Sequence, residues 1–114
     1  MTDMVKWHRR YFPLASAESQ ISHLLQEIRE FEKADTDHTF EELADIFIVG
    51  CSLKRWKRSE RLADEVLNYF YYDFTEDFRK EIDKAVENKM QIVVNRVNNG
   101  EYFWNGIDYD RKRC

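Results

Sequence analysis

The sequence of 114 residues contains few of the residues that interrupt or cross-link a chain: three glycines, one proline and two cysteines. So few turn-forming residues leave little room for the many tight turns that an all-β fold needs. Cys51 and Cys114 are lone thiols without the spacing of a metal-binding motif. We therefore expect a reduced protein that has no cysteine-based metal site.

Long apolar stretches and an excess of basic charge are also missing. No apolar run is long enough to indicate a membrane span, and no signal peptide is recognisable. Eighteen Lys and Arg residues stand against 22 Asp and Glu, which gives a formal net charge of −4. Because non-specific nucleic-acid binding depends on clustered basic residues, it is not expected as the main role. These absences predict a soluble cytoplasmic protein.

Helix-favouring residues fill much of the remaining sequence, and 35% of all residues are charged. The predicted class is all-α, in a single domain over residues 1–114. An N-terminal arm over residues 1–15 is expected to be partly helical, and a C-terminal tail covers residues 101–114. Hydrophobic periodicity predicts four helices between them, over residues 17–34, 37 or 39 to 57, 60–72 and 74–98.

The predicted helix boundaries depend on capping residues. Ser16 and Ser59 are the expected N-caps of the first and third helices. Asp73 is expected to cap the fourth helix in a capping box with Glu76, and Asn99-Gly100 ends that helix.

The second helix has an unusual distribution of apolar residues. Phe40, Leu43 and Phe47 define one apolar face, and a second face carries Ile46, Val49, Leu53 and Trp56. A helix with two apolar faces fits packing against its own chain on one side and a second subunit on the other. We therefore predict a homodimer or a homotetramer.

Two acidic pairs stand on the first two predicted helices. Glu27 and Glu30 are three residues apart, as are Glu42 and Asp45, so each pair lies on one side of its helix. Four converging carboxylates repel one another unless a cation neutralises them. Mg²⁺ is the hard, oxygen-preferring ion that suits such ligands, with Mn²⁺ as the alternative.

Structural roles compete with this metal site. If Thr39 is an N-cap, Glu42 occupies the third helical position and completes a capping box. Glu27 and Glu30 alone would fit a solvated helix flank. Asp45 has no such explanation because it lies beyond the first turn, beside apolar residues. The three histidines are scattered and are expected at the surface or in caps.

Cations also occur in the predicted core. Lys89 and Arg96 fall within the apolar arc of the fourth helix, where each needs an anionic partner because an unpaired buried charge is costly. That partner is either a structural carboxylate or a bound phosphate, and a lysine that extends its ammonium group to solvent is a third interpretation. The basic run over residues 54–58 fits the negative end of a helix dipole or a phosphate contact.

The ordered set of motifs resembles a known family. Glu27-x-x-Glu30, a short turn, Glu42-Leu-Ala-Asp45-Ile and then Lys89-Met with Asn95-Arg96 are similar to the MazG-like all-α nucleoside triphosphate pyrophosphohydrolases. The resemblance covers about residues 5–98. More narrowly, the chain is similar to the small phage and bacterial dATP/dGTP-type branch, whose chains open with a Trp-containing arm.

The resemblance implies a four-helix bundle completed by oligomerisation and a Mg²⁺-dependent nucleotide diphosphatase, acting on a deoxynucleotide in the cytoplasm, or in a bacterial host if phage-encoded. It implies Glu27, Glu30, Glu42 and Asp45 as metal ligands, with Glu30 and Glu27 catalytic. Lys89, Asn95, Arg96 and Trp7 are then candidates for contacts with phosphate or base. Gln26 departs from the family pattern, which often has an acid there.

Two other classes of function compete with this one. A di-iron carboxylate bundle needs Glu-x-x-His pairs, and no histidine here has a glutamate three residues before it. A non-catalytic helical interaction protein that keeps the fold is the remaining alternative. The aromatic run over residues 69–72 and the replacement by Gln26 favour it.

Overall fold

The computed structural model describes residues 3–112, so the predicted arm and tail are seen without residues 1–2, 113 and Cys114. The described residues form five α-helices and an antiparallel hairpin of two strands. The helices are α1 (Met4–Tyr11), α2 (Ala17–Lys33), α3 (Thr39–Ser52), α4 (Glu60–Leu67) and α5 (Glu76–Asn98), and the strands are β1 (Tyr102–Trp104) and β2 (Tyr109–Arg111). The mainly helical prediction is confirmed, and the hairpin is an addition to it.

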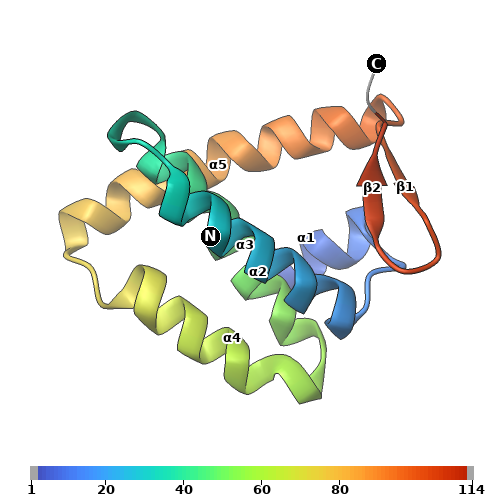
Figure 1. Cartoon of the computed structure of the whole chain (residues 1–114), viewed down its shortest axis with the longest axis horizontal. Helices are drawn as coiled ribbons and strands as arrows, with labels where there is room; N and C mark the ends of the chain where they lie inside the picture. Colours follow the sequence, from blue (N-terminus) through green and yellow to red (C-terminus); the bar gives the residue numbers. More distant parts are fainter. Residues whose placement is uncertain (1–2, 113–114) are drawn as a thin grey trace.

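Helix α3 is the element on which the others pack: it contacts α1, α2, α4 and α5. In Figure 1, α5 and α4 run along opposite sides of the molecule, and α2 crosses between them. Ile46 of α3 and Leu53, which directly follows this helix, are completely buried, in a cluster with Leu24 of α2 and Val66 of α4. The second apolar face of α3 is therefore covered by the chain's own helices. It no longer argues for a subunit interface, and the oligomer stays a prediction.

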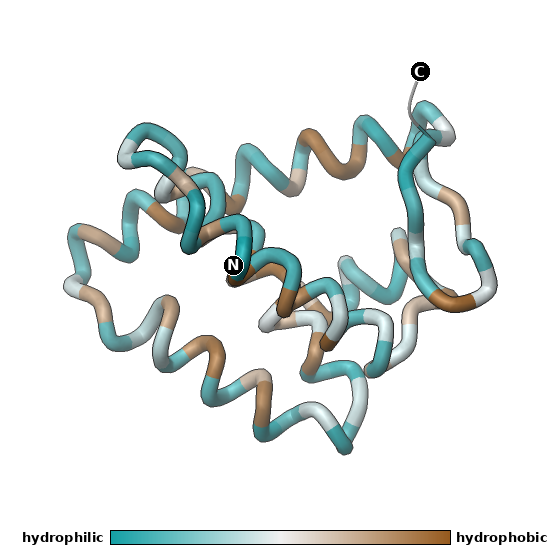
Figure 2. Tube along the Cα trace, viewed as in Figure 1, coloured by the Kyte–Doolittle hydropathy of each residue, from teal (hydrophilic) through white to brown (hydrophobic). Residues whose placement is uncertain are grey.

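Helices α4 and α5 owe their places to amphipathic sequences. Figure 2 shows hydrophobic and hydrophilic segments recurring in turn along both helices. On α5 the apolar stripe buries Ile82, Val86 and Val93, each less than 10% exposed. Such burial is the main force that holds a helix of this kind on its neighbours. Within residues 3–112, no helix is both long enough and apolar enough to cross a membrane.

Some of the predicted N-cap residues are confirmed and others are wrong. Ser16 caps α2 as expected: its hydroxyl accepts a hydrogen bond from the Ser19 backbone N–H at 3.0 Å. The predicted capping box of Asp73 and Glu76 is wrong, because Thr75 caps α5 and its hydroxyl accepts from the Phe78 backbone N–H at 3.3 Å. The predicted arm contains helix α1.

Helix α3 ends five residues before the predicted end at Lys57. Short 3₁₀ turns follow it, and Trp56 between them has an extended backbone, with φ −122° and ψ 134°. Ser59 occupies the predicted N-cap position of α4, but its hydroxyl makes no capping bond. Its buried hydroxyl instead donates to the Leu53 carbonyl at 2.6 Å, which satisfies a backbone group left over at the helix end. A π-helical turn, Asn68–Tyr72, extends α4 to the predicted residue.

The tail folds back as the β1–β2 hairpin. Gly100 stops α5 with a φ of +70°, as the Asn-Gly signal predicted, and Gly106 turns the hairpin with a φ of +99°. Both angles lie in the region that favours glycine. Figure 1 places the hairpin at the C-terminal end of α5. The hairpin thereby becomes a wall of the pocket described below.

Candidate metal centre and adjoining pocket

Three of the four predicted acidic residues converge. Glu27 of α2 and Glu42 and Asp45 of α3 each offer a carboxylate oxygen within 4.8 Å of the others. The short 3₁₀ turn Thr36–His38 joins α2 to α3, so the two helices lie side by side and their acidic faces meet. The side chains of Glu27 and Asp45 are only 10% and 15% exposed. Repulsion between these carboxylates is therefore weakly screened by water.

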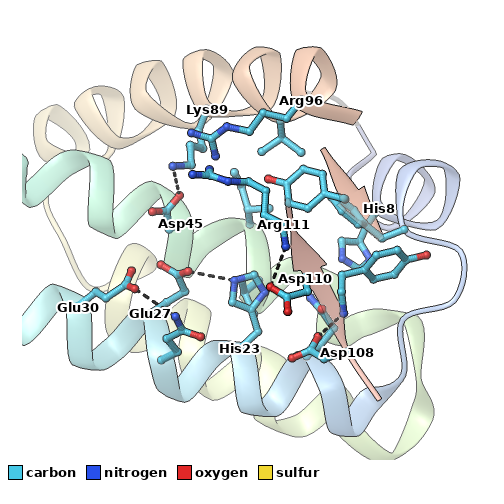
Figure 3. A pocket seen from close by; sticks show the side chains of 18 of the residues that line it. His8, His23, Glu27, Glu30, Asp45, Lys89, Arg96, Asp108, Asp110 and Arg111 are labelled. Atoms are coloured by element: carbon cyan, nitrogen blue, oxygen red, sulfur yellow. Dashed lines mark hydrogen bonds and ion pairs between the residues drawn. The ribbon is translucent and has the colours of Figure 1, made fainter. Parts of the chain in front are cut away.

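Two neighbouring groups neutralise part of this charge. The Lys89 ammonium lies 3.2 Å from Asp45 Oδ1, and His23 Nε2 lies 3.0 Å from Glu27 Oε1. The anionic partner that Lys89 needs is thus a carboxylate of the cluster itself. Figure 3 shows both contacts within one group of side chains.

Two oxygens of the cluster keep no partner. Glu27 Oε2 and Glu42 Oε2 are buried and accept no hydrogen bond from any described residue. A buried, unsatisfied carboxylate oxygen is costly and calls for an explanation. The two orphaned oxygens beside Asp45 fit a hard divalent cation, which prefers carboxylate oxygen ligands.

The electrostatics of the cluster follow from burial and mutual repulsion. Burial raises the pKa of Asp45 to about 7; the nearby Lys89 charge opposes this rise and Glu27 adds to it. Burial also raises the pKa of Glu42, and the charge of Glu27 acts in the same direction. Burial tends to raise the pKa of Glu27 too, but the hydrogen bond and charge of His23 hold it below its ordinary value. A cation bound here would relieve the same repulsion.

The alternative role of Glu42, as partner of an N-cap at Thr39, is wrong. Thr39 is already helical, and the residue before α3, His38, makes no side-chain capping bond. The Thr39 hydroxyl donates to the Asp35 carbonyl at 3.3 Å instead. Glu42 therefore has no cap to complete, and its orphaned oxygen belongs to the carboxylate cluster.

A pocket of about 410 Å³ opens beside the cluster. Glu30, the fourth predicted ligand, lines this pocket but is not among the three convergent carboxylates. It is exposed, and the Gln26 amide donates to its Oε1 at 3.4 Å. Glu30 thus faces the space next to the cluster, and Gln26 contacts it there.

The predicted cations are distributed unevenly. Lys89 and Arg96, two turns apart on α5, both line the pocket. Arg111 of β2 lines it as well, and Figure 3 shows these three side chains together on one side, across from Glu27 and Glu30. Asn95 is exposed, is not a lining residue, and accepts a hydrogen bond from Gln91 at 3.0 Å. The pocket is therefore acidic on one side and basic on the other.

Helix α1 and the hairpin supply aromatic walls. Trp7 lines the pocket, as do Phe12, Tyr102 and Tyr109. The Phe12 ring packs edge-on against the rings of Tyr102 and Tyr109 at 5.3 and 5.1 Å. Trp7 packs against Phe12 at 6.5 Å, so its ring takes part in wall packing. Its predicted contact with a base remains a prediction.

Sequence reasoning missed two groups at this site. His23 was expected at the surface or in a cap, yet it bonds Glu27 and lines the pocket. Its spacing of four residues before Glu27, one turn on the same helix, was the available signal. Arg111 lies in the predicted C-terminal tail, residues 101–114, and nothing local to it indicated a return to the pocket.

The comparisons with known proteins identify no relative. A scan against protein-family models, a search of curated proteins and a search of solved structures each return no match. The function is therefore argued from the site itself.

Proposed function

We propose that this protein is a Mg²⁺-dependent pyrophosphohydrolase that converts a nucleoside triphosphate, with deoxynucleotides as the expected substrates, to the monophosphate and diphosphate. The observation that carries the proposal is the convergence of Glu27, Glu42 and Asp45, with two buried oxygens that lack partners. The basic side of the adjoining pocket supports it, because a polyphosphate needs positive groups opposite the metal. The resemblance to MazG-like enzymes points to the same reaction.

Different side chains would bind the metal ion and the phosphate groups. Glu27, Glu42 and Asp45 would hold the ion, with Mn²⁺ as the alternative to Mg²⁺, and Glu30 lies close enough to the pocket to act on what is bound there. When bound, the ion supplies neutralisation of negative charge on phosphate oxygens. Lys89 and Arg96 bind further phosphate oxygens from the opposite side. His23 keeps the Glu27 carboxylate in place through their 3.0 Å contact.

The reaction then needs a base and a leaving group. A water oxygen bonds to the first phosphorus, and the anhydride bond to the second phosphate breaks. The electron pair of that bond leaves with the diphosphate. Glu30 accepts the proton of the water, a role open to it because it lies outside the three-carboxylate cluster. Positive charge from Lys89 and Arg96 stabilises the departing diphosphate.

A turnover assay tests this function. Purified protein is incubated with Mg²⁺ and each common ribo- and deoxyribonucleoside triphosphate in turn, and released diphosphate is measured. Glu27→Gln and Asp45→Asn are expected to lower turnover at least about 100-fold, because each removes a charge that holds the ion. Glu41→Gln is the matched control, since Glu41 is an exposed residue of the same helix as Asp45. Absence of turnover on every nucleotide, or equal turnover in all variants, would contradict the proposal.

A second candidate is the non-catalytic interaction protein. Tyr69 and Tyr72, in the π-helical turn, are 70% and 55% exposed, more than ordinary packing requires. An interaction surface at this turn predicts that Tyr69→Ser leaves the fold intact. The same assay separates the candidates, because an interaction protein releases no diphosphate from any nucleotide.

A further inference from the structure

The C-terminal hairpin contributes a whole side of the pocket. Five of its residues line the space: Tyr102, Asp108, Tyr109, Asp110 and Arg111. The carboxylate cluster, by contrast, comes entirely from α2 and α3. A ligand held at the cluster would therefore face a segment that lies outside the four predicted helices.

The hairpin is anchored as a fixed wall. Tyr102 and Tyr109 pack edge-on against the Phe12 ring, and the Tyr109 hydroxyl accepts a hydrogen bond from the Leu14 backbone N–H at 2.9 Å. At the base of the hairpin, the Lys112 backbone N–H donates to the Glu101 carbonyl at 2.7 Å. These contacts hold β2, and with it the backbone of Arg111, against the rest of the protein.

The charged groups of the hairpin differ in their partners. The Asp108 and Asp110 carboxylates accept hydrogen bonds from the backbone N–H groups of Tyr109 and Arg111, at 2.8 and 2.9 Å. Within residues 3–112, the Arg111 guanidinium has no carboxylate within 4.0 Å. Figure 3 shows its side chain extending from β2 towards Lys89 and Arg96.

We propose that Arg111 binds a phosphate group of the polyphosphate chain, so that the hairpin completes the basic side of the pocket; this inference rests on the proposed function. A guanidinium presents five N–H donors in a planar fork that matches two phosphate oxygens at once. Lys89 shares its ammonium group with Asp45, so its charge is partly neutralised, whereas the guanidinium of Arg111 is open to an anion. The lining carboxylates outnumber the lining cations, so the anion binds tightly only when the metal is present.

Calorimetric titration of the full chain with inorganic triphosphate, in the presence and absence of Mg²⁺, tests this role without relying on turnover. Arg111→Gln is expected to weaken binding in Mg²⁺ by about tenfold or more, because charge-assisted hydrogen bonds are lost. Arg111→Lys, which keeps the charge but not the fork, is expected to lose less. Lys112→Gln is the matched control, with the same charge change on the next residue, which does not line the pocket.

The outcomes separate the inference from the proposed function. If wild-type protein binds triphosphate and Arg111→Gln binds as tightly as Lys112→Gln, the role of Arg111 is overturned while the function stands. If wild-type protein binds no triphosphate with Mg²⁺, both are overturned. The inference is supported if only Arg111→Gln loses affinity for triphosphate while its unfolding temperature equals that of Lys112→Gln.

Discussion

Replacing Asp45 by asparagine is expected to stabilise the metal-free protein while removing its response to metal. Asp45 has a pKa of about 7 in the folded chain against an ordinary value of 3.8, chiefly because it is buried. A group whose pKa is higher when folded contributes stability below pH 3.8, and this contribution is lost as the pH rises through about 7. At pH 8 the ionised carboxylate therefore destabilises the folded protein.

The size of this effect follows from the shift. About three units of pKa correspond to roughly 4 kcal/mol at pH 8, which is an upper bound. Asparagine removes the charge but leaves Lys89, whose side chain is 29% exposed, without its partner. After that offset, a net gain of about 1–3 kcal/mol is expected, or roughly 4–13 °C in unfolding temperature for a domain of this size.

Thermal unfolding at pH 8 measures both parts of the prediction. With a chelator present, Asp45→Asn should unfold at a higher temperature than wild type, and the difference should shrink as the pH falls towards 4. With Mg²⁺ at about 100 times its dissociation constant, wild type should gain about 2.7 kcal/mol, and the variant little. Glu41→Gln, the exposed control, should match wild type throughout. An Asp45→Asn variant no more stable than wild type without metal, or equally stabilised by Mg²⁺, would refute the reasoning.

Two further predictions concern stability away from the carboxylates. Burial, followed by the charge of Arg55, lowers the pKa of His8 from 6.5 to about 3, so its contribution to stability is present above pH 6.5 and is lost as the pH falls. Between pH 7 and 5 the free energy of unfolding of wild type should fall by about 2 kcal/mol through His8, and urea unfolding should find a smaller fall in His8→Gln. The same dependence on pH in both proteins would contradict this role of His8. At Gly50 an added Cβ would lie 3.1 Å from Val66 Cγ1 and 3.3 Å from Leu67 Cδ2. Gly50→Val should therefore lower the free energy of unfolding by about 1–3 kcal/mol, and Gly50→Ala by less, because alanine favours the helix. If Gly50→Val is as stable as wild type, the prediction is wrong, because α4 can then move to accommodate the larger side chain without cost.

Much of the helical architecture could be predicted because it depends on local patterns. The range predicted for the first helix, 17–34, matches α2 within one residue, and Ser16 caps it as expected. Apolar residues at helical spacing and a capping hydroxyl act over one or two turns, so the sequence displays them directly. The end of α3 was missed because the Ser59 hydroxyl bonds back to Leu53, a contact that periodicity does not report.

The candidate site was predicted in part for the same reason. The spacing of Glu42 and Asp45 indicated one face of one helix, and Lys89 was recognised as a cation that needed an anionic partner. Which carboxylates converge was not decided by spacing. Glu27 joins the cluster and Glu30, three residues later, does not, because the packing of α2 on α3 decides which side chain meets Asp45.

The sequence by itself determined which charged residues share a helix face, since the helical repeat sets that locally. Only the tertiary structure decided that Glu27 and Glu42 keep buried oxygens without partners, and that Arg111 returns to the pocket. The hairpin reaches its place through contacts such as that between Leu14 and Tyr109, which lie 95 residues apart. Contacts over such a separation depend on how all the helices pack, and no local pattern encodes them.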